Sequence, residues 1–266
     1  MVYPLTCDDG YATFVRFATD IVVRVVSSMI GDSDPTSPAP DQAILGNPAL
    51  AALVGPHASF AEGRGNAVRY HPDVCPMAAL PDDPTAEDWA AAAVLVGPGH
   101  SIFLPVVAVT PPDGWGVVMS IPGVQMVDRA VDAAPDDEAI ELTAADVPEM
   151  TELVRRTEPG PFRPRTIELG TYLGIRRDGR LIAMAGERLR LPGWTEISAV
   201  CTDPDFRGQG LGSRLVRAVA HGIRGHGETP FLHAAGDNVG AIRLYEAMGF
   251  ELSRRVMFQV FTAPDR

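Results

Sequence analysis

The fold of this chain is decided by the stretch Glu196-Ile-Ser-Ala-Val-Cys-Thr-Asp-Pro-Asp-Phe-Arg-Gly-Gln-Gly-Leu-Gly-Ser213. Its first part is rich in apolar and β-compatible residues and ends at Asp203-Pro204, because proline cannot donate to a sheet ladder. Beyond the glycines, apolar residues recur every fourth position from Leu211 to Ile223, which is the spacing of one buried helix face. The glycines therefore lie where a predicted strand is followed by a predicted helix.

A strand, a glycine-rich turn and a helix in this order suit the binding of an anion. The first backbone N–H groups of a helix lack internal partners and lie at the positive end of the helix dipole. Glycines allow a phosphate to approach closely, and Arg207 adds a planar set of donors that matches phosphate oxygens. We interpret residues 207–213 as a loop that binds a pyrophosphate.

Other interpretations of the glycines fit less well. A dinucleotide-binding fingerprint, Gly-x-Gly-x-x-Gly, requires a glycine where this chain has Ser213, and a P-loop requires a lysine, which the chain lacks. A further alternative is that the glycines only permit a tight turn. Three alternate glycines behind an arginine exceed what one turn requires, so the anion-binding interpretation is favoured.

The composition indicates a folded, soluble protein. Its 266 residues are 46% hydrophobic, which is enough material for one large or two ordinary domains. The apolar segment Ile21 to Ile30 is too short to span a bilayer and is interrupted by Arg24, and the first residues lack a basic region and a cleavage site. We therefore expect a cytoplasmic protein that does not enter a membrane.

The three cysteines, Cys7, Cys75 and Cys201, include no Cys-x-x-Cys pair. An odd and small number of cysteines indicates neither a disulfide framework nor a zinc site. His71 and Cys75 are four residues apart, but the prolines beside them argue against a helix that presents both side chains. No metal ion is expected.

The net charge of −12 is confined to the first half of the chain. Residues 1–137 contain 17 acidic residues and 5 arginines, whereas residues 138–266 contain 17 of each. Such a field repels nucleic acid and anionic membranes, and it attracts a cationic amine or a basic partner. The alternative is that the acidic residues only keep the protein soluble.

Hydrophobic periodicity and turn residues predict a mixture of helices and strands in both halves of the chain. In the first half these are a helix or strand at 11–30, a flexible connection at 32–41, helices after the caps Asn47 and Thr85, and strands at 101–109 and 116–127. In the second half they are a strand at 138–143, a helix capped by Thr143 or Asp146, strands at 172–176 and 181–189 joined by the turn Asp178-Gly179, a strand at 194–202, a helix ending near Gly225 or Gly227, a strand at 231–235, a helix at 238–248 ended by Gly249, and final strands at 251–261.

Two motifs of the second half carry a resemblance to a known family. The first is Arg207-x-x-Gly210-x-Gly212 after a strand, and the second is Asn238-Val-Gly-Ala-Ile-Arg-Leu-Tyr245-Glu-Ala-Met-Gly-Phe250. Together they strongly resemble the GNAT superfamily of acetyl-CoA-dependent N-acetyltransferases, and its FR47-like subgroup in particular. The resemblance covers residues 138–260, roughly half of the chain.

The resemblance implies an α/β fold with a mixed sheet, the GNAT acetyltransferase fold, for residues 138–266. The Pro- and Asp-rich residues 134–137 form a reasonable boundary to a first domain at 1–133. Neither motif occurs in that first domain. It is therefore either a degenerate GNAT-like domain that completes the substrate cleft or an unrelated α/β accessory domain.

The resemblance also implies a ternary complex in which a primary amine attacks the thioester of acetyl-CoA directly. The amine must lose a proton, and the departing thiolate benefits from an acid. Tyr245 matches the family's usual acid; the alternative is a core aromatic whose hydroxyl reaches the surface.

Glu196 is the leading base, with Glu187 and His233 as competing candidates, although a glutamate at a strand end is often a solvated charge. Cys201 is interpreted as a small apolar strand residue and not as a nucleophile.

The residues that the resemblance implies for acetyl-CoA binding belong to the strand, the loop and the later helix. They are Val200, Cys201, Thr202, Arg207, Gly208, Gln209, Gly210, Leu211, Gly212, Ser213, Asn238 and Tyr245. Backbone groups of Val200 and Thr202 match the family's contacts to the pantetheine arm, and Asn238 matches a side-chain contact to it. Thr202 stands where the family often has valine, which matters little for a main-chain contact.

We therefore predict an acetyl-CoA-dependent N-acetyltransferase that acts on a small amine or on an exposed protein amine, with a cationic amine as the expected acceptor. The alternative is a catalytically silent acyl-CoA-binding regulatory module, which would keep the loop without the chemistry. A nucleotide-dependent oxidoreductase conflicts with the glycine spacing. The sequence leaves open the acceptor, the acyl chain length and the oligomeric state, for which a homodimer is one option.

Overall fold

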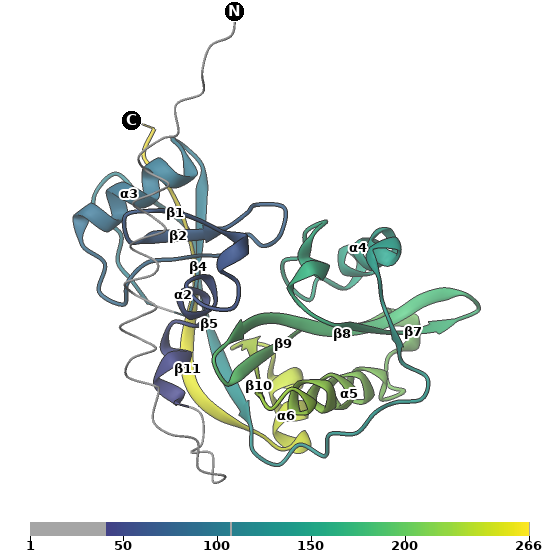
Figure 1. Cartoon of the computed structure of the whole chain (residues 1–266). Helices are drawn as coiled ribbons and strands as arrows, with labels where there is room; N and C mark the ends of the chain where they lie inside the picture. Colours follow the sequence, from purple (N-terminus) through teal and green to yellow (C-terminus); the bar gives the residue numbers. More distant parts are fainter. Residues whose placement is uncertain (1–40, 107, 266) are drawn as a thin grey trace, which may run out of the picture.

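An eight-stranded sheet forms the centre of the computed structural model, which describes residues 41–106 and 108–265 (Figure 1). Its strand order is β4-β11-β5-β10-β9-β8-β7-β6, and a separate three-stranded sheet has the order β1-β2-β3. This arrangement confirms the predicted α/β fold with a mixed sheet. The interpretations of residues 11–30, of residues 32–40 and of Cys7 lie outside the described residues.

Helices and strands alternate irregularly along the chain. The helices are α2 (Pro48–Leu53), α3 (Ala86–Val96), α4 (Val147–Thr157), α5 (Leu211–Gly225) and α6 (Val239–Met248), with 3₁₀ turns at η1 (Gln42–Gly46), η2 (Ala58–Phe60), η3 (Ala144–Asp146), η4 (Thr166–Leu169) and η5 (Pro204–Phe206). The strands are β1 (Ala61–Arg64), β2 (Ala67–Tyr70), β3 (Ala78–Ala79), β4 (Ser101–Val106), β5 (Gly116–Asp128), β6 (Ile140–Glu141), β7 (Tyr172–Arg177), β8 (Arg180–Leu191), β9 (Trp194–Thr202), β10 (Thr229–Ala235) and β11 (Phe250–Thr262).

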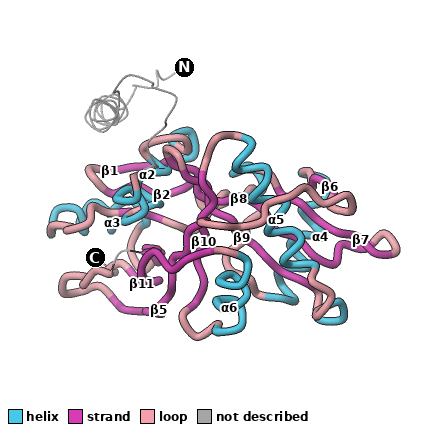
Figure 2. The backbone as a smooth tube through the Cα atoms, turned by 90° about the horizontal axis from the view of Figure 1, so that it is seen from below, coloured by secondary structure: helices cyan, strands magenta, loops and turns pink. Residues whose placement is uncertain are grey.

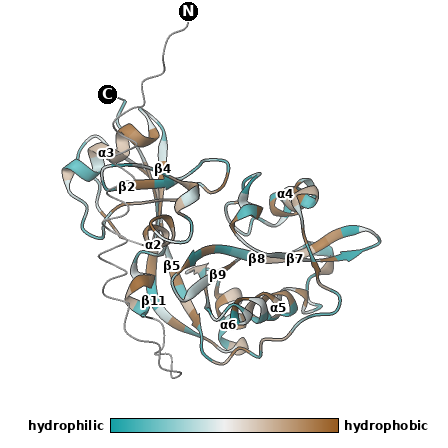
Figure 3. Cartoon of the chain, in the orientation of Figure 1, coloured by the Kyte–Doolittle hydropathy of each residue, from teal (hydrophilic) through white to brown (hydrophobic). Residues whose placement is uncertain are grey.

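Helices α5 and α6 cover one face of the large sheet (Figures 1 and 2). The apolar residues of α5 from Leu211 to Ile223 are buried against the strands, as their spacing predicts, and pack with Ile197 and Leu232. Hydropathy colouring shows both apolar and polar residues along α5, which is typical of a helix with one buried face (Figure 3). The helix that follows the glycines is therefore fixed by the core.

The opposite face of the sheet is covered by α2 and α4. Beside α2, Trp194 and Phe231 pack edge to face with ring centroids 6.5 Å apart. Helix α4 buries Met150 and Leu153 against β8 and β9. The central strands are thus covered by helices on both faces.

Two strands from the first half of the chain belong to the same sheet as the second half. Strand β5 lies between β10 and β11, and β4 pairs with β11 on its other side. The segment that joins the halves is held by Arg214 of α5, which donates to both carboxylate oxygens of Asp136 at 2.6 and 2.7 Å. The division into domains at 1–133 and 138–266, and the relation of the first to the GNAT fold, stay predictions.

Local sequence signals predicted several element ends correctly. Thr85 and Asp88 form a reciprocal capping box at the start of α3, and Asn47 caps α2. Asp178 and Gly179 take the left-handed conformation that a two-residue hairpin turn requires, with φ of 50° and 79°. The strand predicted at 138–143 is shorter than expected, because only residues 140 and 141 pair with β7.

None of the helices within residues 41–106 and 108–265 is both long and apolar enough to cross a bilayer.

Candidate active site

Strands β9 and β10 separate near the middle of the sheet. They are the only parallel neighbours in the described sheet, and they pair from Trp194 with Thr229 to Ile197 with Leu232. Pairing then stops, although β9 continues to Thr202 and β10 to Ala235. The backbone groups of β9 that face β10 beyond Ile197 therefore have no strand partner within the described residues. Such an unpaired edge is available to a ligand that carries amide groups.

A β-bulge accompanies this separation. Three steps along β9, from Ser198 to Cys201, lie opposite two steps along β8, from Gly186 to Met184. Ala199 has a φ of 52°, a left-handed conformation that is uncommon for a residue other than glycine. A bulge bends the strand that carries the extra residue, and this one lies directly beyond the last β9–β10 pair.

The predicted pyrophosphate-binding loop begins where β9 ends. Gly208 and Gly210 have φ of 80° and 74°, so a residue with a side chain would be strained at either position. A Cβ atom at Gly208 or Gly210 would meet no atom within 4 Å, which leaves this backbone open to a ligand. Gly210 precedes α5 directly, and the described residues supply no side-chain cap to its N–H groups. These are the groups that favour an anion.

The loop and the unpaired part of β9 lie against each other. A Cβ atom at Gly212 would be 3.6 Å from Thr202 Oγ1 and 3.9 Å from Val200 Cγ1. Arg207 is exposed, and its Nε donates to the Thr202 carbonyl at 3.3 Å. The structure therefore brings together the strand and loop residues for which acetyl-CoA contacts were predicted.

The other residues predicted to contact acetyl-CoA differ in how far their side chains are exposed. Gln209 is exposed and Ser213 is half-buried, so both side chains can reach a ligand. Leu211 is buried in the core and offers only its backbone. Cys201 is also buried, and burial raises the pKa of its thiol to about 11, which fits an apolar strand residue.

Tyr245 lies on α6 and is 8% exposed. Its ring packs edge to face on Phe250, with centroids 6.0 Å apart, in the apolar cluster that includes Leu211 and borders Val200. Burial raises the pKa of its hydroxyl to about 12, so Tyr245 is protonated at neutral pH. The hydroxyl makes no hydrogen bond to the described residues, and it is thus free to donate to a ligand.

Asn238 is exposed at the start of α6. Its Oδ1 accepts from the Ala241 N–H at 3.1 Å, so the side chain caps the helix. This contact orients the amide group and leaves its NH₂ donors available to a ligand.

Glu196 is fully buried and forms two hydrogen bonds with Arg188 of β8. Arg188 Nε lies 2.8 Å from Glu196 Oε2, and Arg188 Nη2 lies 2.6 Å from Oε1. Burial acts to raise the pKa of Glu196, but the Arg188 guanidinium and a hydrogen bond from His233 outweigh it and lower the pKa to about 2. Glu196 is therefore ionised at neutral pH.

A row of polar side chains continues from Glu196 across the sheet. His233 Nδ1 donates to Glu196 Oε1 at 2.6 Å, which leaves His233 Nε2 to accept from Gln125 Nε2 at 3.0 Å. Gln125 also donates to the Leu45 carbonyl at 3.0 Å. The row Arg188, Glu196, His233 and Gln125 thus crosses β8, β9, β10 and β5, close to the point where β9 and β10 separate.

Of the three candidate bases, the structure brings Glu196 and His233 into contact and leaves Glu187 apart. Glu187 Oε2 accepts from the Thr171 N–H at 3.3 Å, and burial raises the pKa of this carboxyl. Sequence reasoning did not identify Arg188, Gln125 or the bulge at Ala199. Arg188 lies in a part of β8 that also contains Glu187 and Arg190, so no local signal distinguished it as the buried partner of Glu196.

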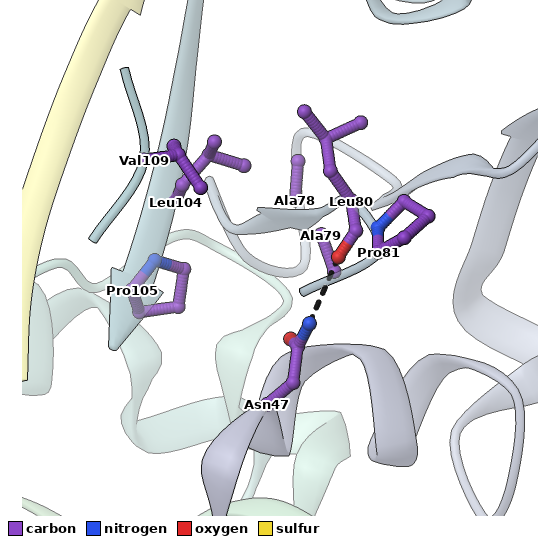
Figure 4. Close-up of a pocket in the computed structure, with 8 residues that line it drawn as sticks. All are labelled: Asn47, Ala78, Ala79, Leu80, Pro81, Leu104, Pro105 and Val109. Atoms are coloured by element: carbon purple, nitrogen blue, oxygen red, sulfur yellow. Dashed lines mark hydrogen bonds between the residues drawn. The ribbon is translucent and has the colours of Figure 1, made fainter. Parts of the chain in front are cut away.

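A small pocket lies away from this site, in the first half of the chain (Figure 4). Its empty volume is about 210 Å³, and it is lined by Asn47, Ala78, Ala79, Leu80, Pro81, Leu104, Pro105 and Val109. Asn47 is its one polar side chain, and this side chain already donates to the Leu80 carbonyl at 2.8 Å. The pocket shares no residue with the strand, loop and polar row described above.

The chain is similar in sequence to known acetyltransferases. The family model for FR47-like proteins matches residues 172–258. The N-alpha-acetyltransferase RimI of Mycobacterium tuberculosis is 34% identical over 121 residues, which are 41% of this chain and 75% of that protein. A mycothiol acetyltransferase of Mycobacteroides abscessus is 40% identical over 63 residues, which are 23% of this chain and only 21% of that enzyme.

A solved structure extends the similarity to most of the chain. A crystal structure from Novosphingobium aromaticivorans, assigned to the GNAT family of acetyltransferases, shares 39% sequence identity with a TM-score of 0.75. The match covers 82% of this chain and 97% of that one, so it includes strands from both halves.

Proposed function

This chain belongs to the GNAT family of N-acetyltransferases and is an acyltransferase, and from that premise we propose that it transfers the acetyl group of acetyl-CoA to a primary amine. One observation carries the proposal. The unpaired edge of β9 lies directly beside an open glycine loop at the start of a helix. An acyl donor with an amide-bearing arm and a pyrophosphate matches these two surfaces in that order.

The donor is proposed to bind mainly through the backbone of this chain. Main-chain groups of Val200 and Thr202, which lie beyond the last β9–β10 pair, would pair with the pantetheine amides. The N–H groups after Gly210 would receive the pyrophosphate, and exposed Arg207 would add charge-assisted hydrogen bonds. Asn238, already oriented by its capping contact, would reach the arm from the other side.

For the chemical step we assign proton donation to Tyr245. When the amine attacks the thioester, the carbonyl carbon becomes tetrahedral, and the C–S bond then breaks and leaves a thiolate. A donor must carry its proton when that charge develops, and the raised pKa of Tyr245 ensures this at neutral pH.

For the proton lost by the amine we propose Glu196 acting with His233. Because the pKa of Glu196 is lowered to about 2, the carboxylate is a weak base itself, but it accepts the Nδ1–H of His233 and thereby orients the imidazole ring. His233 Nε2 would be the basic atom once the Gln125 Nε2 that donates to it at 3.0 Å has moved aside. The His233 side chain is only 3% exposed, so the proton would reach it through a water.

Replacing Gly212 by valine is expected to weaken acetyl-CoA binding at least about tenfold, which is about 1.4 kcal/mol. The added side chain would occupy the space between the start of α5 and the unpaired part of β9 without straining the backbone, because Gly212 is helical. Isothermal titration with acetyl-CoA measures the effect. Gly222→Val in the same helix is the control, since a Cβ atom there meets nothing within 4 Å. Equal affinity in both folded variants would contradict the assignment of the loop.

The acceptor is proposed to be a cationic amine that is attracted by exposed acidic residues of the first half, such as Asp83, Glu87 and Asp113. At saturating acetyl-CoA, kcat/KM for the best amine should fall between about 0.1 M and about 1 M salt, as the Debye length shrinks from about 10 Å to about 3 Å. kcat should change little. An acceptor peptide with added acidic residues should show the opposite slope, and a flat kcat/KM for both would mean that the charge serves solubility.

Thiol release from acetyl-CoA in the presence of an amine panel tests the proposal as a whole. The panel should include peptides with free α-amines, because a relative of this chain is named an N-alpha-acetyltransferase. Release that depends on one class of amine is the expected result. Tight binding of acetyl-CoA with no amine-dependent release would instead identify a silent binding module.

A further inference from the structure

Asp203 lies at the turn between β9 and the glycine loop, and its side chain is 2% exposed. The carboxylate pairs with Arg180, at the start of β8, and with Arg156 of α4, whose Nη2 is 3.0 Å away. Its Oδ1 also accepts from the Asp205 N–H at 3.1 Å. The Asp203 N–H donates to the Ile182 carbonyl at 2.7 Å. One buried carboxylate thus joins α4, β8 and the turn η5.

The loop after this turn has little support of its own. Residues 207–210 are exposed, two of them are glycines in the left-handed conformation, and the Gly210 end has no side-chain cap from the described residues. Its position therefore depends on what holds its two ends. At the helix end, Leu211 is buried in the core. At the strand end, the holding contacts are those of Asp203, the packing of Phe206 against the same core, and the hydrogen bond from Arg207 Nε to the Thr202 carbonyl at 3.3 Å.

The arrangement of Arg156 shows that Asp203 cannot be replaced without consequence. Arg156 is one-quarter exposed and pairs with two carboxylates, with its Nη2 3.0 Å from Asp203 and its Nη1 3.5 Å from Glu152. Removing the carboxylate charge would take away the ion pairs to Arg156 and Arg180 that tie α4 and β8 to the turn.

We propose that Asp203 is a positioning residue, which holds the strand end of the loop at 207–210 where the loop N–H groups meet the pyrophosphate of acetyl-CoA. This inference rests on the proposed function. It assigns Asp203 no contact with the donor or the acceptor. Its effect should therefore be confined to donors that carry the pyrophosphate.

Asp203→Asn is expected to weaken acetyl-CoA binding about tenfold or more, because the neutral amide keeps the acceptor for Asp205 but loses the two arginines. The kcat/KM for S-acetylpantetheine, which has the thioester and the arm but no pyrophosphate, should stay near the wild-type value. A general loss of structure would weaken the use of both donors, so a loss for acetyl-CoA alone would identify an effect on pyrophosphate binding.

Asp128→Asn is the matched control. Asp128 is also buried, with a 3% exposed side chain, and accepts two hydrogen bonds from Arg224 at 2.7 and 2.8 Å near the far end of α5. This variant should lose stability without losing acetyl-CoA affinity. If Asp203→Asn fails to fold, Arg180→Gln removes one half-exposed partner and should show a smaller effect of the same kind.

Wild-type affinity for acetyl-CoA in the folded variants of Asp203 and Arg180 would overturn the inference, as would an equal loss for both donors. A wild-type protein that binds no acetyl-CoA would overturn the proposed function, and the inference with it.

Discussion

Replacing Tyr245 by phenylalanine is expected to lower kcat by about 10²–10⁴ and to leave acetyl-CoA affinity almost unchanged. The substitution removes only a hydroxyl that makes no hydrogen bond to the described residues, and the ring keeps its packing on Phe250. The loss should therefore appear in the chemical step. Single-turnover measurement of thiol release, with acetyl-CoA affinity from titration, separates the two effects.

Tyr172→Phe is the control for this experiment. The Tyr172 hydroxyl is likewise buried without a partner among the described residues, and the side chain is 1% exposed, so it has no access to substrate. The control should retain the wild-type rate. A Tyr245→Phe protein with near-normal single-turnover rate would show that the thiolate leaves without help from this residue.

Replacing Glu196 by alanine is expected to lower the free energy of unfolding by about 3–5 kcal/mol, because it leaves Arg188 buried without a counter-charge. Urea unfolding at neutral pH measures this loss. Glu168→Ala is the control, since Glu168 makes a similar pair with Arg165 at the surface, and its removal should cost less than about 1 kcal/mol.

The double variant Arg188→Met with Glu196→Leu separates stability from activity. An apolar pair of similar size often replaces a buried ion pair without loss of stability, so most of the lost free energy should return. Activity should not return, because His233 still lacks the carboxylate that orients it. Full activity in the double variant would exclude any role of Glu196 in proton transfer.

The stabilising effect of Glu196 should also depend on pH. Its pKa in the folded protein, about 2, lies below its ordinary value of 4.5. A carboxyl whose pKa is lowered by folding stabilises the protein above the unfolded pKa, and this contribution is lost as pH falls through the folded pKa. The difference in unfolding free energy between wild type and Glu196→Ala should therefore shrink between about pH 4.5 and about pH 2.

Local signals in the sequence were sufficient to predict the elements around the site. The apolar spacing after Leu211 predicted α5, Asp178-Gly179 predicted the hairpin, and Asn238 predicted the start of α6. Each of these depends on residues within a few positions of one another, where backbone preferences and side-chain period act directly. The strand, loop and helix that form the proposed donor site were therefore accessible to sequence reasoning.

The long-range features of the fold could not be predicted from the sequence. Pairing of β5 with both β10 and β11 joins segments more than 100 residues apart, and no local pattern encodes that register. The left-handed conformation at position 199 could not be predicted, because the residue there is alanine and not the glycine that usually takes this conformation. Glu196 was predicted to be the leading base, with a solvated charge as the alternative. Its burial and its pairing with Arg188 depend on the neighbouring strand β8, which no local pattern around Glu196 indicates.

The central claim, transfer of an acetyl group from acetyl-CoA to an amine, is tested most directly by a product balance. The protein is incubated with acetyl-CoA and the best amine of the panel, and free thiol and acetylated amine are quantified in the same samples by a thiol reagent and by mass spectrometry. The account predicts one acetylated amine for each thiol released, and the loss of both products in Tyr245→Phe. Thiol release without acetylated amine, or neither product from a protein that binds acetyl-CoA, would contradict it.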